Sequence, residues 1–320
     1  MGSSAFDRTS LGGRVANYFS FLLAAALAGF FIRRRDIIIC GTDPPLTILV
    51  GVLVARGEPL VYAVQDLHPE ATTASGLLRQ ESLLVRAWER VHRWALRRCT
   101  HIVCLGSGMA RRIESKGIHP DLISVIRTGA GAPSAPVDPA VVDRLRGDEG
   151  LVIVHAGNIG TAGPWDEIAT AAVTAVGVHF VFVGDGVAAD DLRARGVDVQ
   201  PFLPLADVSS VMAAGDLQMV ALGAGLSNAV VPSKLYTALG HGRPIFAVVP
   251  EQSEVAEIVR HYNCGIVVEP HTEAIAEAAT HLAKDTSQLE QLEANARRAA
   301  LELSKERSLN DWISLVERLT

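Results

Sequence analysis

Several patterns that would indicate a metal or redox centre are missing from this chain. None of its four cysteines, at positions 40, 99, 104 and 264, forms a Cys-x-x-Cys pair, and its ten histidines show no His-x-x-x-His spacing. An Asp-x-Asp motif is absent as well. We therefore predict no metal site, and we expect the thiols to be reduced, as in the cytosol, and buried in strands and helices.

Basic charge is also scarce. Lys and Arg number 29 against 35 Asp and Glu, which gives a formal net charge of −6 at pH 7. A nucleic-acid partner is not expected, because such proteins carry a basic footprint. A chain of 320 residues that is 49% hydrophobic and 20% charged is globular and long enough for two domains.

Short apolar runs alternate with helical patterns along the chain. This alternation predicts parallel sheets with crossover helices, and therefore an α/β fold. In the first half we expect helices at 79–97 and 107–116, with strands at 37–40, 60–64, 102–105 and 122–126. In the second half we expect strands at 151–155, 180–183, 198–202, 217–222, 245–249 and 265–268.

The stretch 129–139 is rich in Gly, Pro and Ala and separates the two series. Such composition favours a linker over a helix or strand. We therefore predict two domains, residues 1–135 and 136–320.

The segment 231–249, VPSKLYTALGHGRPIFAVV, has the most chemical character. Pro232 and Ser233 precede a short helical pattern, and Lys234 lies at its start. A helix start offers unpaired backbone N–H groups and partial positive charge, so it can hold a phosphate. The alternative is an ordinary capped helix whose lysine is solvated.

This segment also resembles the donor-site region of family 4 glycosyltransferases, in the branch that reads PSKLY and then GRP or GKP. Other stretches resemble the same family in the same order along the chain. They are DIIICGTDPPL (36–46), YAVQDLHPE (62–70), HAGNIGTAGPWDEI (155–168), FVFVGDG (180–186) and SEVAEIVRHYNCGIVVEP (253–270).

The resemblance implies the GT-B fold, in which two Rossmann-like domains with parallel sheets face a cleft and the last helix, here about 310–318, crosses back. It implies a metal-independent, retaining transferase with a nucleoside-diphosphate sugar as co-substrate and no cofactor. The acceptor would be a lipid-linked or growing cell-surface saccharide. Two alternatives stay open: a tailoring transferase for a soluble natural product, and a degenerate domain that binds a partner without transferring sugar.

The donor would be held by the C-terminal domain. Negative charge develops on the leaving diphosphate, and positioned N–H groups and cations stabilise it. By resemblance, the residues expected to bind the donor are Gly157, Asn158, Gly160, Phe202, Ser233 and Lys234. The family's usual pair of glutamates is missing, because Ala229 and Thr237 occupy those positions.

Two residues of the N-terminal half are predicted to be catalytic, on the acceptor side. Asp66 and His68 follow an expected strand, and ligands of parallel sheets meet the carboxyl ends of strands. A structural role is the alternative, with Asp66 capping the next helix.

The N-terminal domain is expected to be reduced, because family members open with further strand–helix units before the position of Ile37. The strand at 37–40 should then have an open edge, which favours a homodimer or a partner. The helix expected at 16–35 has an apolar run of about fifteen residues, shorter than the ~20 that span a bilayer. It either packs under the sheet or rests on the inner face of a membrane, with Arg33, Arg34 and Arg35 as its basic flank. We expect a cytoplasmic protein in either case.

Overall fold

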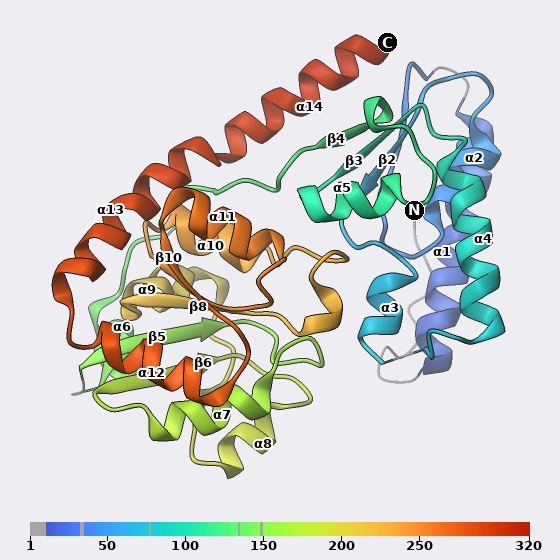
Figure 1. Ribbon diagram of the computed structural model, residues 1–320. Helices are drawn as coiled ribbons and strands as arrows, with labels where there is room; N and C mark the ends of the chain where they lie inside the picture. The colour runs from blue at the N-terminus through green and yellow to red at the C-terminus, as the bar shows by residue number, and fades with distance from the viewer. Residues whose placement is uncertain (1–10, 33–34, 77, 134, 148–149) are drawn as a thin grey trace. The chain divides into compact units, whose positions relative to one another are not determined.

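The computed structural model describes residues 11–32, 35–76, 78–133, 135–147 and 150–320. It forms two α/β units (Figure 1). Unit 1 contains the chain up to Arg127 together with Asn310–Thr320, and unit 2 contains Thr128–Leu309.

Unit 1 has a four-stranded parallel sheet in the order β1-β2-β3-β4. Its strands are β1 (Ile38–Cys40), β2 (Leu60–Val64), β3 (His101–Cys104) and β4 (Ile123–Val125). Its helices are α1 (Leu11–Phe31), α2 (Thr47–Val54), α3 (Glu70–Ala74), α4 (Leu83–Leu96) and α5 (Ser107–Glu114), followed by the 3₁₀ turn Pro120–Leu122. The four expected strands are confirmed, each shifted by a residue or two at most.

Both faces of the unit 1 sheet are covered. One face buries Tyr62 and Ile102 against residues of α2, α4 and α5, such as Leu96. The other face buries Val61 against Leu315 of α14 (Lys305–Leu319), the last helix. The end of the chain therefore returns to unit 1, as expected from the resemblance.

Helix α1 packs on α2 as an outer layer, where Gly29 lies against Val54. Arg35 joins the two helices, because its guanidinium donates to the carbonyl oxygens of Gly29 at 2.8 Å and Val54 at 3.0 Å. It also pairs with Glu58 at 2.9 Å. The interpretation of Arg35 as a membrane-facing flank is therefore wrong. Arg33 and Arg34 lie outside the described residues.

Unit 2 has a six-stranded parallel sheet in the order β10-β9-β8-β5-β6-β7. The chain builds the sheet outward from β5 in one direction and then from β8 in the other. This is the Rossmann order, with its switch point between β5 and β8. The strands are β5 (Leu151–Ala156), β6 (Val178–Val183), β7 (Asp198–Gln200), β8 (Leu217–Ala221), β9 (Ile245–Val248) and β10 (Gly265–Val268), so all six expected strands are confirmed.

Helices cover the unit 2 sheet on both faces, which is why the central β5 residues Val152, Ile153 and Val154 are all fully buried. The helices are α6 (Pro139–Arg146), α7 (Trp165–Thr174), α8 (Ala189–Ala194), α9 (Val208–Ala214), α10 (Lys234–Gly240), α11 (Glu254–Tyr262), α12 (Thr272–Leu282) and α13 (Thr286–Glu302). Short 3₁₀ turns lie at Leu205–Asp207 and Ala224–Leu226.

The boundary between the units lies between Arg127 and Thr128, not at residue 135. The segment 129–139, expected as an interdomain linker, contacts unit 2. Ala130 bridges to Ser304, and the Asp138 amide donates to the Ser210 hydroxyl at 2.9 Å. These contacts assign the segment to unit 2.

Two further expectations concern unit 1 and the cysteines. Within the described ranges β1 pairs only with β2, so it is an edge strand, as expected. All four cysteines are free and buried, as predicted, but only Cys40 and Cys104 lie in strands, since Cys99 comes after α4 and Cys264 directly before β10. No helix among the described residues has both the length and the apolar character needed to cross a membrane.

Candidate functional site

A cavity of about 310 Å³ opens in unit 2 at the switch point of the sheet, within the size range of small-molecule sites. In an open α/β sheet, ligands bind at this point beyond the carboxyl ends of the strands. The cavity is lined by Ala156, Gly157, Val183, Phe202, Leu203, Pro204, Leu205, Val208, Val211, Met212, Gln218, Met219, Val220, Ser233, Lys234 and Thr237.

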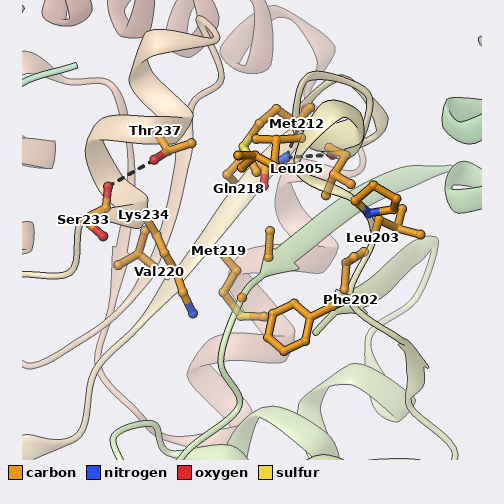
Figure 2. Close-up of a pocket in the computed structure, with 16 residues that line it drawn as sticks. Phe202, Leu203, Leu205, Met212, Gln218, Met219, Val220, Ser233, Lys234 and Thr237 are labelled. Atoms are coloured by element: carbon orange, nitrogen blue, oxygen red, sulfur yellow. Dashed lines mark hydrogen bonds between the residues drawn. The ribbon is translucent and has the colours of Figure 1, made fainter. Parts of the chain in front are cut away.

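One wall of the cavity is apolar. Phe202 and Met219 lie opposite the residues of α10 in Figure 2, and Phe202 is 59% exposed although it is aromatic. Gln218 is the polar exception in this wall, and its amide donates to the Met212 carbonyl oxygen at 3.0 Å. An exposed aromatic ring beside an apolar wall suits the face of a flat, partly polar ligand.

The other wall is the start of α10. Pro232 precedes it, and the Thr237 amide and hydroxyl both bond the Ser233 carbonyl oxygen. Figure 2 shows Lys234 extending from this helix toward the cavity. Its Nζ lies 2.8 Å from His155 Nε2 and 3.3 Å from the Asn158 carbonyl oxygen.

The protonation states of Lys234 and His155 complement each other, because a charged lysine faces a neutral histidine. His155 is 1% exposed and packs against Trp165 and Phe182, and burial lowers its pKa to about 3, with the Lys234 charge adding to the effect. The neutral ring therefore accepts through Nε2 from the ammonium. Burial also lowers the pKa of Lys234, to about 8. Because His155, the side chain that accepts from Lys234, is neutral, an arriving anion does not have to displace a carboxylate from the ammonium.

Glycines make room for this lysine. Gly157 has φ +122°, a conformation that favours glycine, and a Cβ there would lie 2.8 Å from Lys234 Cε. A Cβ at Gly184 would collide with the Gly157 carbonyl oxygen. The turns after β5 and β6 therefore approach each other and Lys234 more closely than any side chain would allow.

The predicted donor residues converge on this cavity. Gly157, Phe202, Ser233 and Lys234 line it, and Asn158 contributes its carbonyl oxygen to Lys234. Gly160 is not in the wall; its carbonyl oxygen accepts from Trp165 Nε1 and shapes the turn.

Sequence reasoning missed two residues of the site. No role was predicted for His155, because its contact with Lys234 joins residues 79 positions apart in the sequence. Gln218 carried no signal, because one polar residue in an apolar strand is ordinary. Thr237, which stands where the family has a glutamate, lines the cavity, whereas Ala229 is buried elsewhere.

Asp66 and His68 belong to unit 1 and follow β2. The Asp66 amide donates to the Thr42 hydroxyl, and His68 stacks on Trp88 with its Nδ1 2.9 Å from Thr72 Oγ1. The Asp66 side chain does not cap α3, whose first turn begins at Pro69 without a side-chain cap.

The pKa values of Asp66 and His68 are both shifted from their ordinary values. Although Asp66 reaches the surface, protein around its carboxyl group excludes enough water to raise its pKa, and Asp43 adds to this while His68 opposes it. Burial lowers the pKa of His68 against the pull of Asp66, Glu70 and Asp43. A carboxylate beside a neutral imidazole can accept a proton or hydrogen bond from a hydroxyl.

No three His, Cys, Asp or Glu side chains gather into a group suited to a metal ion among the residues that the structure describes.

Comparison with known proteins places the cavity inside a recognised domain. Residues 153–285 match the family model described as Glycosyl transferases group 1. The chain is 26% identical to the probable glycosyltransferase WbjE of Pseudomonas aeruginosa over 248 residues, which are 73% of this chain and 62% of that protein. It therefore spans less than two thirds of that relative's length.

Solved structures share the architecture. The Anabaena Alr3699/HepE structure in complex with UDP-glucose matches with a TM-score of 0.72 and 18% identity, over 98% of this chain and 85% of that chain. WaaG, a glycosyltransferase involved in lipopolysaccharide biosynthesis, matches with a TM-score of 0.65 and 16% identity, over 96% and 85%. These likenesses and the two parallel sheets show that the fold is GT-B, with the group 1 glycosyltransferase match confined to residues 153–285 of unit 2.

Proposed function

We propose that the protein is a glycosyltransferase that moves a sugar from a nucleoside-diphosphate sugar to a lipid-linked or cell-surface saccharide. We propose further that transfer retains the anomeric configuration and needs no metal ion. The observation that carries the proposal is Lys234, which lies at the start of α10 on the edge of an apolar cavity at the sheet's switch point.

The cavity suits a donor divided into an apolar-faced base and a charged diphosphate. The wall with Phe202 and Met219 would take the base, and Lys234 would take the diphosphate. As the bond from the sugar to the diphosphate breaks, negative charge grows on the phosphate oxygen. A fixed ammonium in a site with little water stabilises that charge without a covalent step. This role for Lys234 supports metal independence.

Asp66 and His68 would serve the acceptor. The acceptor hydroxyl loses a proton as it attacks the sugar carbon, and Asp66 is suited to accept a hydrogen bond from it. The relatives favour a saccharide acceptor, since WaaG is involved in lipopolysaccharide biosynthesis.

Two alternatives were expected from the sequence, and an observation favours one of them. The missing glutamates at Ala229 and Thr237 favour a domain that binds nucleotide without transferring sugar. A transferase for a soluble natural product would use the same unit 2 cavity with a different unit 1 surface.

Calorimetric titration of nucleoside diphosphates tests the donor site. Lys234→Ala should weaken binding by about 1.5–3 kcal/mol, or roughly 10- to 150-fold, because a charge-assisted hydrogen bond is lost. Lys284→Ala, an exposed lysine of the same unit, is the matched control and should bind as wild type does. Equal affinity of Lys234→Ala and wild type would refute the assignment.

Transfer itself is tested with labelled nucleotide sugars and a bacterial lipid extract, in excess chelator. Label in the lipid fraction, reduced in Asp66→Asn without a change in nucleotide affinity, is the expected result. Nucleotide binding without transfer to lipid or soluble acceptors would favour the non-catalytic alternative. Activity that chelator abolishes and Mg²⁺ restores would contradict metal independence.

A further inference from the structure

Helix α4 has an unusual outward surface. Its inward face packs Val85, His92, Ala95 and Leu96 into unit 1. At about 100° per residue, the exposed positions divide into two adjacent stripes along the helix. One stripe is apolar and consists of Leu83, Leu84, Ala87, Val91 and Trp94. The other consists of Arg86, Arg90 and Arg93, and Arg97 at the C-cap continues it.

The apolar stripe is exposed to a degree that the fold does not need. Leu83 is 79% exposed, Leu84 62% and Trp94 46%. Two neighbouring leucines and a tryptophan on one helix surface form a patch rather than the isolated apolar residues that are normal on protein surfaces.

Most of the arginine stripe is not paired with carboxylates. The one carboxylate of α4, Glu89, is already held by Lys116 at 2.7 Å and Arg93 at 2.8 Å. Elsewhere in the described chain, no carboxylate lies within ion-pair distance of Arg86, Arg90 or Arg97. Arg98 follows the helix and lies over the Trp94 ring at 4.8 Å. This is a concentrated positive surface on a chain whose net charge is −6.

Neighbouring helices of unit 1 also expose large apolar side chains. Helix α2 contacts both α1 and α4, and all three belong to unit 1 (Figure 1). Helix α1 exposes Phe19 at 68% and Phe31 at 82%, and α2 exposes Leu53 at 59%. Exposed apolar side chains in unit 1 are therefore not confined to α4.

We propose that the exposed face of α4 docks on an anionic lipid bilayer. The helix would lie in the plane of the interface, with its apolar stripe at the acyl boundary and its arginines on lipid phosphates. Tryptophan and arginine suit this position because each has an apolar body and a polar tip. A second copy of the chain fits poorly, because it would bring two arginine stripes together, and a nucleic acid would leave the leucines in water.

Flotation of the full chain with phosphatidylcholine vesicles, with and without phosphatidylglycerol, tests the proposal. Binding should require phosphatidylglycerol and weaken at high salt. The triple variant Arg86→Gln, Arg90→Gln, Arg97→Gln should partition about 10- to 100-fold more weakly, because each basic residue near an anionic surface contributes about fivefold. No donor or acceptor is added, so the result is independent of the proposed function.

A matched control removes the same net charge elsewhere. Arg111→Gln, Arg144→Gln, Lys284→Gln changes three exposed basic residues outside α4 and should bind vesicles nearly as wild type does. An equal loss in both triples would overturn the proposal, because net charge alone would then explain binding. Unchanged binding in the α4 triple would overturn it as well.

The apolar stripe is tested separately by Leu83→Gln, Leu84→Gln, two exposed positions whose change leaves the inward face of α4 intact. This variant should lose vesicle binding at least tenfold while keeping its melting temperature. Wild-type binding would contradict the inserted orientation. Binding of RNA in place of vesicles, or a dimer that the arginine triple dissociates, would overturn the lipid proposal in favour of those partners.

Discussion

Nucleotide affinity should depend on pH through Lys234. Burial lowers the pKa of this ammonium from an ordinary 10.5 to about 8, so in the empty site it is about 90% charged at pH 7 and about 10% at pH 9. The terminal phosphate of a nucleoside diphosphate titrates near pH 6, so its charge is constant across this range. Between pH 7 and pH 9, therefore, only the charge of Lys234 changes at this contact.

The direction and size of the change in nucleotide affinity follow from the linkage between nucleotide binding and proton binding. A bound diphosphate stabilises the charged lysine, so binding at high pH requires uptake of a proton that the empty site has lost. Affinity should therefore fall about tenfold between pH 7 and pH 9, in proportion to the charged fraction of the empty site. The fall should approach the whole 1.5–3 kcal/mol of the contact at still higher pH.

Calorimetry in two buffers of different ionisation enthalpy measures both the affinity and the proton uptake. Lys234→Met removes the titrating group, so its weaker binding should not vary between pH 7 and pH 9. Lys234→Arg keeps a charge that does not titrate in this range and should give the same flat profile. A flat wild-type profile, or an equal fall in the arginine variant, would refute the reasoning.

Three other changes test separate parts of the structure. Gly157→Ala should destabilise the protein by about 1–3 kcal/mol in urea and weaken nucleotide binding, because its Cβ would meet Lys234 Cε at φ +122°; unchanged stability and binding would contradict the packing. Lys116→Met should lower the free energy of unfolding by about 3–5 kcal/mol, because the fully buried ammonium pairs with both Glu70 and Glu89 at 2.7 Å. Arg112→Met, at the exposed end of the same cluster, should lower the free energy of unfolding by less than about 1 kcal/mol. Ile39→Lys, on the open edge of β1, should dissociate any homodimer seen in size-exclusion chromatography and leave a folded monomer; an unaffected dimer would place the interface elsewhere.

The sequence predicted the sheets well because parallel strands buried on both faces are nearly continuous apolar runs. The run at 151–155 became β5 and the run at 245–249 became β9. Their order in the sheet came from the family resemblance rather than from the runs, since strand order depends on contacts far apart in the chain.

The site was predicted only in part, because only some of its residues have a signature in the local sequence. Ser233 and Lys234 could be identified because a helix start with a cation has a local signature. His155 could not, because its role depends on a lysine 79 positions away that reaches it across the sheet end. Arg35 was misinterpreted for a similar reason: its partners Gly29, Val54 and Glu58 come together only when α1 packs on α2.

A crystal structure of the protein with a bound nucleoside diphosphate tests the central claim most directly. The account predicts a phosphate oxygen within about 3 Å of Lys234 Nζ and the base against Phe202 in the unit 2 cavity. A nucleotide bound outside this cavity, or within it while Lys234 stays 2.8 Å from His155 Nε2 without touching phosphate, would contradict the account.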